Sequence, residues 1–305
     1  EIMKILDYGE KYENPVVLVL GFFDCVHVGH AALVKEAISR SDEGEPCVFT
    51  FGNDMGSFFG KGEGSVLTFS ERTERLGELG VNLAVKAVFD RAFSGTEPKE
   101  FLDKLFSSLN VKRVVCGFDY TFGRYGKGNV GMLADYCGER KIGFSAVGCV
   151  EMSGEKVSTT KVKELLAAGD VSAANKLLGY PYFLRGEVVK DRGVGRTIGF
   201  PTANVKIGKD KFRIAAGVYE SFCTVDGVTY PAITNYGARP TFGLGEVLTE
   251  TYLIGYSGDL YGKSLRVNFL KYLRGDKKFA GIEELKEQLR KDEETSKNDF
   301  IRTER

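Results

Sequence analysis

The chain has only two histidines, which stand three residues apart in Gly21-Phe-Phe-Asp-Cys-Val-His27-Val-Gly29-His30. An apolar strand pattern precedes this segment, and a helical stripe follows it. In a parallel sheet, ligands bind at the carboxyl ends of the strands, and a helix N-terminus there offers free N–H groups to a phosphate. Gly29 permits close approach of a ligand. We therefore expect His27 and His30 to donate hydrogen bonds to the α-phosphate of a nucleotide as charge builds there.

Two histidines at the start of a helix can also be packed or exposed without any function. The strand-loop-helix context, together with the absence of other histidines, favours the functional interpretation. If the attacking group is already an anion, neither histidine needs to transfer a proton.

A run of hydroxyl residues supplies a second candidate for phosphate binding. Ser158, Thr159 and Thr160 open a helical pattern whose first turns carry Lys161 and Lys163. Hydroxyls, free N–H groups and an ammonium group together can bind a triphosphate. Taken alone, the run is more typical of ordinary helix capping. With the histidine segment upstream, the binding interpretation leads.

A glycine-rich loop precedes Pro201-Thr202-Ala-Asn204 and contains Gly193, Gly195 and Gly199. Its backbone N–H groups could cradle phosphates. Thr202 and Asn204 are two residues apart, so they share a face in an extended segment, and their oxygens suit Mg²⁺. The loop lacks the pattern of a Walker loop. By itself such a string is more often a turn that leads into a strand.

Glu250 opens a strand pattern in which Tyr252, Ile254 and Tyr256 share its face. We expect this face to be partly buried and to face a ligand. A carboxylate there can accept a hydroxyl proton while that oxygen attacks a γ-phosphate. Position alone favours a solvated side chain, because Glu250 is one of 42 acidic residues.

The first half of the chain alternates strand and helix patterns, which predicts a parallel sheet with crossover helices. The strands are expected at residues 16–20, 47–51, 83–89, 111–116 and 143–150. Helices are expected at 33–38, where apolar residues recur with helical spacing, and at 70–80, 97–109 and 132–140. Ser70 is expected as the N-cap of the helix at 70–80. Two short helices follow, at 158–168 and 171–178.

Period-2 segments at residues 219–225, 251–256 and 265–269 dominate after Pro181 and predict a small antiparallel barrel or sandwich. One helix closes the chain, with Ile282, Leu285 and Leu289 on one face. The fold class is therefore α/β with a Rossmann-like parallel sheet, followed by an antiparallel β-barrel. We expect two domains, residues 1–180 and 181–305.

The composition narrows the class of protein. The 305 residues carry 42 basic and 42 acidic side chains, so a broad basic footprint for nucleic acid is not expected. No apolar run reaches the ~20 residues of a membrane span, and the start of the sequence lacks the pattern of a signal peptide. The six cysteines form no Cys-x-x-Cys pair, which favours free thiols in a reducing cytoplasm.

The histidine segment resembles the nucleotidyltransferase signature of the bacterial FAD synthetases, which are bifunctional riboflavin kinase/FMN adenylyltransferases. The resemblance covers nearly all of the chain. Its further segments include Gly117-Phe-Asp-Tyr-Thr-Phe-Gly123, Val157-Ser-Thr-Thr-Lys-Val-Lys163, Pro201-Thr-Ala-Asn204, Asn235-Tyr-Gly-Ala-Arg239-Pro-Thr-Phe242 and Leu273-Arg274-Gly-Asp-Lys-Lys-Phe279. The chain departs from the family pattern at three places. Cys25 replaces a common glycine, Thr73 a common lysine, and Phe51-Gly-Asn-Asp-Met-Gly56 lacks the usual Pro-His-Pro.

The resemblance implies two ATP-dependent steps. The barrel would phosphorylate riboflavin to FMN with Mg²⁺, and the N-terminal domain would join FMN to the α-phosphate of a second ATP, which gives FAD and pyrophosphate. Two alternatives stay open, namely an enzyme with one live activity and a flavin-binding sensor without turnover. Riboflavin, FMN and ATP are the expected partners, and self-association is left open by the sequence.

The site residues that the resemblance and the motifs imply fall into four groups. The catalytic residues are His27, His30 and Glu250, and the metal ligands are Thr202 and Asn204. The flavin ligands are Asp119, Phe122, Arg239 and Arg274. The nucleotide ligands are Gly21, Phe22, Phe23, Asp24, Gly29, Ser158, Thr159, Lys163, Gly193, Gly195, Gly199 and Pro201.

Overall fold

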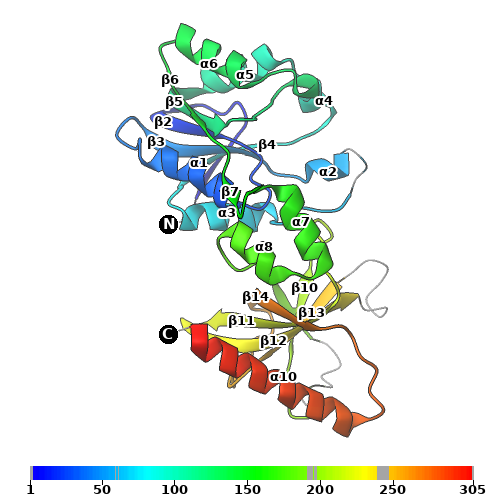
Figure 1. Ribbon diagram of the computed structural model, residues 1–305. Coiled ribbons are helices and arrows are strands. Elements are labelled where there is room, and N and C mark those ends of the chain that lie inside the picture. Colours follow the sequence, from blue (N-terminus) through cyan, green and yellow to red (C-terminus); the bar gives the residue numbers. More distant parts are fainter. Residues whose placement is uncertain are drawn as a thin grey trace. The chain divides into compact units, whose positions relative to one another are not determined.

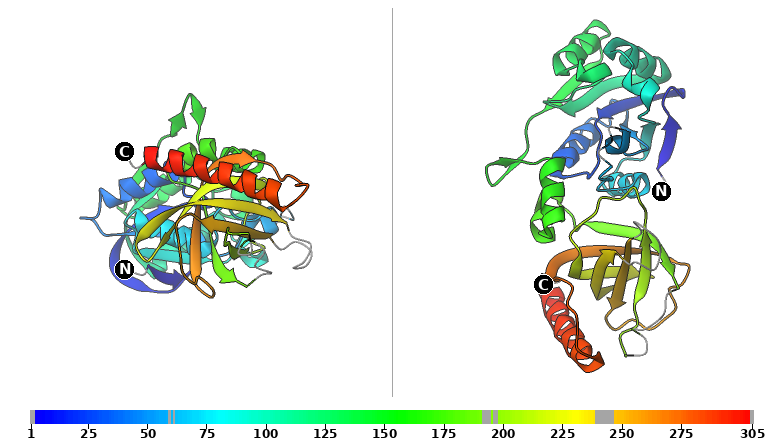
Figure 2. Two further views of the ribbon diagram at one scale, coloured as in Figure 1. Left: turned by 90° about the horizontal axis from the view of Figure 1, so that it is seen from below. Right: turned by 90° about the vertical axis from the view of Figure 1, so that its right-hand side faces the viewer.

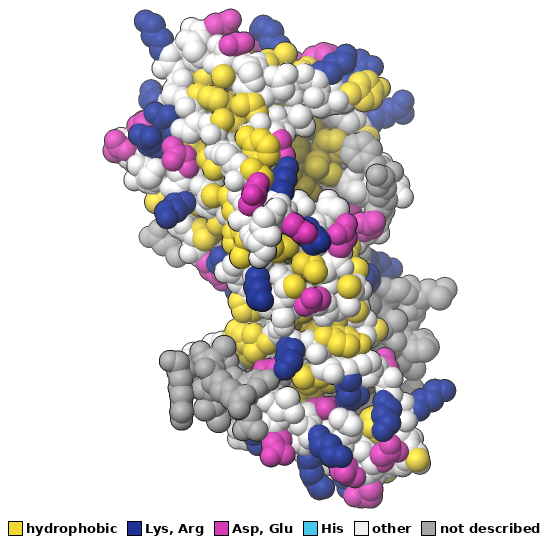
Figure 3. Space-filling model, viewed as in Figure 1, with side chains coloured by type: hydrophobic (Ala, Val, Ile, Leu, Met, Phe, Trp, Pro, Cys, Tyr) yellow, Lys and Arg dark blue, Asp and Glu magenta, His cyan; other side chains and the backbone are white. Residues whose placement is uncertain are grey.

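The computed structural model describes residues 3–58, 60, 62–190, 195, 198–238 and 247–303. Contacts between residues divide the chain into two compact units, Glu1–Thr159 and Thr160–Arg305. We describe each unit by itself (Figure 1). Charged side chains of both signs are interspersed over the face shown in Figure 3, in keeping with the balanced composition.

The first unit is built on a six-stranded sheet in the order β1-β4-β3-β2-β5-β6, and all of its strand pairs are parallel. The expected parallel sheet is thereby confirmed. Its strands are β1 (Lys4–Asp7), β2 (Tyr12–Leu20), β3 (Glu45–Phe51), β4 (Leu83–Ala87), β5 (Leu109–Gly117) and β6 (Gly143–Val147).

Helices cover both faces of this sheet. Figure 1 places α5 (Pro98–Ser108) and α6 (Val130–Glu139) on one side and α1 (Val28–Ile38) on the other. Alternate residues of β2 pack with α5 and α6 in one core cluster, while Val17 and Val19 are buried outside that cluster. Burial of both faces explains why the strands are almost continuously apolar. The remaining elements are α2 (Met55–Phe58), α3 (Phe69–Glu78), α4 (Arg91–Ser94) and the hairpin β7 (Glu151–Met152) and β8 (Glu155–Lys156).

The N-cap of α3 is Thr68, so the expectation of Ser70 was wrong. The Thr68 hydroxyl accepts the N–H of Glu71, and the Glu71 carboxylate accepts the N–H of Thr68 at 2.8 Å. This reciprocal pair is a capping box, in which the Thr-x-x-Glu spacing satisfies two backbone donors at once. Ser70 lies inside the helix.

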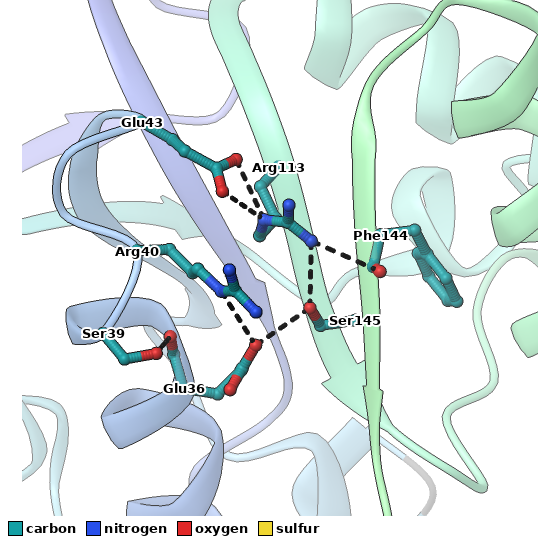
Figure 4. A network of polar contacts seen from close by, with 7 residues as sticks. All are labelled: Glu36, Ser39, Arg40, Glu43, Arg113, Phe144 and Ser145. Atoms are coloured by element: carbon teal, nitrogen blue, oxygen red, sulfur yellow. Dashed lines mark hydrogen bonds and ion pairs between the residues drawn. The ribbon is translucent and has the colours of Figure 1, made fainter.

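Arg113 of β5 organises a polar network that holds α1 against the sheet (Figure 4). Its Nε donates to the carboxylate of Glu43 at 2.9 and 3.0 Å, and its Nη1 donates to the hydroxyl of Ser145 on β6 at 3.1 Å. Ser145 in turn donates to Glu36 of α1 at 3.0 Å. Bonds of this kind between ionised groups are stronger than neutral ones, so the network helps to fix where α1 lies.

The second unit is a closed antiparallel barrel in the order β10-β13-β12-β11-β14-β9, as expected from the period-2 segments. Figure 2 shows these strands curving around the barrel, with α10 (Ile282–Thr303) alongside it. The strands are β9 (Phe183–Val189), β10 (Ala203–Ile207), β11 (Gly217–Val225), β12 (Val228–Ala238), β13 (Val247–Leu253) and β14 (Ser264–Arg274). Because β13 ends at Leu253, Ile254 and Tyr256 do not continue the strand that carries Glu250.

The helices α7 (Thr159–Ala168) and α8 (Val171–Leu178) belong with the barrel. Asn175 donates to the carbonyl of Phe269 at 2.8 Å and accepts the N–H of Tyr182 at 2.7 Å. The carbonyl of Leu166 accepts the N–H of Ala215 at 3.1 Å. These bonds connect both helices to the body of the second unit.

A truncation tests this assignment. A chain that begins at Thr160 should unfold at a clearly higher temperature than one that begins at Gly179, because the shorter chain loses the bonds of Asn175 and the buried side chains of Val171, Ala174 and Leu178. Each of the two larger side chains, Val171 and Leu178, contributes ~1.5–3 kcal/mol, so the midpoint should fall by ~10 °C or more. Circular dichroism measures both midpoints, and equal values would contradict the assignment.

Candidate functional site

The loop between β2 and α1 is held in a strained conformation by a buried carboxylate. Phe23 and Val26 have φ angles of 58° and 43°, and a β-branched residue rarely adopts this left-handed region. Asp24 between them is 2% exposed, its Oδ1 accepts the N–H of Val66 at 3.0 Å, and its carbonyl accepts the N–H of Leu67 at 2.9 Å. Asp24 therefore positions the loop.

Arg72 of α3 supports the same loop through Thr50. Sequence analysis did not identify this residue. The side chain is 1% exposed, and its Nη1 donates to Thr50 Oγ1 at 3.0 Å and to the carbonyl of Phe51 at 2.7 Å. Thr50 Oγ1 donates in turn to the carbonyl of Phe22 at 2.7 Å. Burial lowers the pKa of Arg72, while the negative charge of Asp24 counteracts that shift. No signal in the sequence reveals the role of Arg72, because an arginine on an amphipathic helix is ordinarily a surface residue.

His27 is the N-cap of α1, where its Nδ1 accepts the N–H of His30 at 3.2 Å. The two rings stack at 3.8 Å between centroids. Burial lowers the pKa of His27 to about 4 and lowers the pKa of His30 well below its ordinary value. Both imidazoles are therefore neutral at pH 7. Since Nδ1 of His27 is an acceptor, its proton lies on Nε2.

A cavity of about 340 Å³ lies at the carboxyl ends of the strands, in front of the histidines. Phe23 and Asp24 are buried and lie outside this lining, and their expected contact with a nucleotide stays a prediction. Among the lining residues that were not expected are Phe118, Cys149 and Lys156. The expected residues in its lining are Gly21, Phe22, His27, Gly29, His30, Asp119, Ser158 and Thr159.

Lys156 connects the β7–β8 hairpin to this cavity. Its ammonium group pairs with Asp119 and lies 4.9 Å from the centroid of the Phe118 ring. Asp119 was expected as a flavin ligand, and in the structure its carboxylate has this lysine as its partner. The cavity wall therefore carries a cation that is available to an incoming phosphate once the pair opens.

A second cavity, of about 650 Å³, adjoins the first and shares Gly21, Phe22, Tyr120 and Thr121 with it. Its other walls are mainly aromatic and include the expected Phe122. The aromatic residues beyond the shared ones are Phe49, Phe51, Phe58, Phe89, Phe93, Phe101 and Tyr125. A flat apolar ring system could be enclosed here, with its polar end directed to the histidines.

In the barrel, Glu250 of β13 lies opposite Asn204 of β10 and opposite Asn235 of β12. Directly opposed residues share one face of a sheet. The neighbouring positions Thr234 and Thr251 are fully buried inside the closed barrel, so the face of Glu250 is the outer one. The Oδ1 atoms of Asn204 and Asn235 are buried and have no hydrogen-bond partner among the described residues. Sequence analysis did not single out Asn235.

Pro201 and Thr202 line a smaller cavity of about 290 Å³ together with Tyr256 and Tyr261. Two glycines of the preceding loop, Gly195 and Gly199, lie among the described residues, and at both positions the backbone disfavours any larger residue. A Cβ at Gly195 would lie 2.3 Å from the carbonyl oxygen of Phe200, and Gly199 has a φ angle of 88°. The expected ligands Gly193 and Arg239 lie outside the described residues.

Two expected ligands have other partners in the second unit. The ammonium group of Lys163 lies 5.2 Å from the centroid of the Phe212 ring. Arg274 binds the carboxylate of Asp292 on α10 through Nε at 3.2 Å and through Nη2 at 2.7 Å. Asp292 is 5% exposed, so this pair anchors the terminal helix. Arg274 therefore has an anchoring role in the structure, and its expected contact with the flavin stays a prediction.

Comparisons with known proteins match both units. A family model described as FAD synthetase matches residues 9–161, and one described as riboflavin kinase matches residues 178–300. The bifunctional riboflavin kinase/FMN adenylyltransferase of Listeria monocytogenes is 33% identical over 294 residues, which cover 94% of this chain and 93% of that protein. The protein of the same description from Bacillus subtilis is 33% identical over 286 residues, with coverages of 91% and 90%.

A solved structure extends the similarity to the whole fold. The crystal structure of a macrolide-efflux protein from Streptococcus pneumoniae has a TM-score of 0.87 and 30% identity, and it covers 98% of this chain and 99% of that chain. In the described part of the present chain, none of the helices combines the length and the apolar character that crossing a membrane requires.

The lowered pKa values of the histidines predict a pH dependence that can be measured directly. Because the chain has two histidines, an NMR titration of their ring Cε1–H signals should show two transitions, with His27 near pH 4 and His30 below pH 6.5. As the pH falls below 6.5, the histidines become protonated in the unfolded state but stay neutral in the folded state. Stability should therefore fall from pH 6.5 toward pH 4, by up to about 1.4 kcal/mol per pH unit and histidine. Two transitions near pH 6.5 would contradict this.

Proposed function

Because the chain belongs to the bifunctional riboflavin kinase/FMN adenylyltransferase family, we propose that its two units perform the two ATP-dependent steps separately. The family makes the protein a transferase with flavin and ATP as substrates. We assign adenylyl transfer to the first unit, residues 1–159, and riboflavin phosphorylation to the barrel unit, residues 160–305. The observation that carries the first assignment is the neutral histidine pair, which lines a cavity that adjoins a second, aromatic cavity.

Adenylyl transfer joins the phosphate of FMN to the α-phosphate of ATP and releases pyrophosphate. The attacking oxygen is already anionic, so no base is needed. Negative charge grows on the α-phosphate in the transition state, and N–H donors aimed at it lower the barrier. Nε2–H of His27 is such a donor, and His30 supplies a second. A neutral donor stays in place at all pH values near 7, because neither imidazole titrates there.

The two adjoining cavities suit the two substrates. The aromatic cavity of about 650 Å³ takes the isoalloxazine ring, with Phe122 as a wall, and its volume lies in the ~300–1,000 Å³ range of ligand pockets. The cavity in front of the histidines takes ATP. Gly29 leaves room there, since a Cβ at this position would lie 3.0 Å from the ring of His27. Ser158 and Thr159 offer hydroxyls to the phosphates.

In the barrel we assign Glu250 as the base that accepts the proton of the riboflavin 5′-hydroxyl while its oxygen attacks the γ-phosphate of ATP. The half-buried position of Glu250 on the outer face, beside the cavity-lining Thr202 segment, supports this role. The glycine-rich loop with Gly195, Gly199 and Pro201 would hold the phosphates.

The residues present fit a magnesium ion. Asn204 has a buried amide oxygen without a partner in the described part of the barrel, and Thr202 stands two residues before it. Oxygen donors of this kind are what Mg²⁺ prefers. When bound, Mg²⁺ neutralises the phosphate charge of ATP, and Thr202 and Asn204 are the residues that would hold it. The six cysteines are free thiols, which supports a reducing cytoplasm as the place of action.

Substitution of His30 tests the role of the pair. The His30→Ala protein should lose ~10²–10³ in the rate of FAD formation from supplied FMN, as for the loss of one transition-state donor. The His30→Gln protein retains an N–H donor and should lose less. FMN formation from riboflavin, measured by chromatography in the same preparation, should be unchanged in both. Unchanged FAD formation in the alanine protein would refute the mechanism.

Glu250→Gln is the reciprocal test. It keeps the size of the side chain but removes the base, so phosphorylation of riboflavin should fall by ~10²–10⁴. FAD formation from supplied FMN should continue at the normal rate. Loss of both activities would indicate misfolding, and retention of both would mean that the base lies elsewhere.

A further inference from the structure

Cys25 brings a thiol to the histidine pair. Its side chain is fully buried and forms no disulfide. One ligand atom from each of Cys25, His27 and His30 lies within 4.8 Å of the other two. Across the residues that the structure describes, this is the one group of three such side chains found that close together.

The donor set selects a particular class of ion. Thiolate sulfur and imidazole nitrogen are ligands of Zn²⁺ and similar thiophilic ions, whereas Mg²⁺ prefers oxygen. Bonds of the lengths found for zinc place tetrahedral ligand atoms about 3.5 Å apart. To bind one ion, the three ligand atoms must move closer together, and the stacked imidazole rings must turn so that their lone pairs converge.

An independent observation supports a ligand here. The Nδ1 atom of His30 is buried and has no hydrogen-bond partner among the described residues, and such an atom in a folded protein needs an explanation. Both histidines line the cavity of about 340 Å³. This cavity gives an ion a route to the site and leaves a fourth coordination position open to water. Cys25 Sγ lies 3.4 Å from the hydroxyl of Thr159, which lines the same cavity.

We propose that Cys25, His27 and His30 form a three-ligand site for Zn²⁺ or another thiophilic divalent ion, and that the bound ion blocks adenylyl transfer. Binding releases the thiol proton to solvent. The ion takes a lone pair from each imidazole and occupies the place of the reacting phosphate. The inhibitory half of this proposal rests on the proposed function of the histidines, whereas the binding half does not.

The ion must also displace the cap of α1. A metal on Nε2 of His27 needs the ring proton on Nδ1, and a metal on Nδ1 replaces the N–H of His30 there. In both cases the hydrogen bond between Nδ1 and this N–H is lost. With three protein ligands and this loss, we expect binding weaker than at a four-cysteine structural site.

Binding is tested with Co²⁺ as a spectroscopic probe in the full-length protein. One equivalent should give a thiolate-to-cobalt charge-transfer band, and Zn²⁺ should abolish it. The band should be absent from Cys25→Ser and retained in Cys149→Ser, a matched control because Cys149 is exposed and lines the same cavity. X-ray absorption of the zinc-loaded wild-type protein should show one sulfur at about 2.3 Å and two nitrogens at about 2.0–2.1 Å. A band that survives in Cys25→Ser, or a spectrum without sulfur, overturns the site.

Inhibition is tested by zinc titration of both activities in one preparation. FAD formation from FMN should stop at zinc concentrations that leave FMN formation from riboflavin intact, which controls for chelation of ATP. Loss of a residue that merely supports a metal ligand lowers metal affinity ~10–100-fold. Cys25→Ser removes a ligand itself, so it should raise the half-inhibitory zinc concentration by at least that factor. Equal loss of both activities, or equal sensitivity of Cys25→Ser, overturns the inhibition. If cobalt binds as described and FAD still forms while the ion is bound, the binding site is confirmed and the role assigned to the histidines in adenylyl transfer is wrong.

Discussion

The chemistry of the first unit depends on the buried carboxylate of Asp24. The loop around it passes twice through left-handed backbone conformations, at Phe23 and Val26, and such residues cost of order 1–3 kcal/mol each. The bonds from Val66 and Leu67 to Asp24 hold the loop there. Without the carboxylate, the N–H of Val66 would be buried and unpaired, and Arg72 would lose its negative neighbour. The start of α1, and with it the direction of both imidazoles, follows from this one anchor.

Electrostatics then favours neutral histidines. The N-terminus of α1 carries the positive end of a helix dipole, and Arg72 adds a buried positive charge behind the loop. A protonated imidazole would add a further positive charge in a desolvated place. Burial therefore outweighs the usual tendency of histidine to titrate near neutral pH. The positive potential of this region remains available to a phosphate, while the histidines contribute oriented dipoles.

The sequence could predict the elements whose pattern is local. The parallel sheet, the barrel and the helix starts at Val28 and Thr159 follow from periodicity and capping residues. Features that depend on distant partners could not be predicted. The N-cap of α3 is not such a feature, because Thr68 has Glu71 three residues later, which is the local spacing of a capping box, whereas Ser70 does not. Arg72 looks like a surface residue of an amphipathic helix, and only the sheet beside it shows that it is buried.

The same limit applies to the barrel. Glu250 could be placed on a strand, but its two asparagine neighbours come from strands whose register no local pattern reveals. Arg274 lies in a segment that resembles a ligand-binding motif, yet its partner Asp292 is 18 residues further along, on a helix. A basic residue near a motif has many potential acidic partners, and tertiary structure selects one of them.

The two units solve the problem of holding a phosphate near a reactive group in different ways. In a parallel sheet the strand ends leave an open edge, so loops and a helix N-terminus can converge there. A six-stranded barrel offers no such edge, and its interior is filled by side chains such as Tyr219 and Phe269, which are fully buried. The carboxylate of Glu250, which we propose as the base, accordingly stands on the outer face. Side chains on neighbouring strands are the groups nearest to it, which explains why Asn204 and Asn235 flank Glu250.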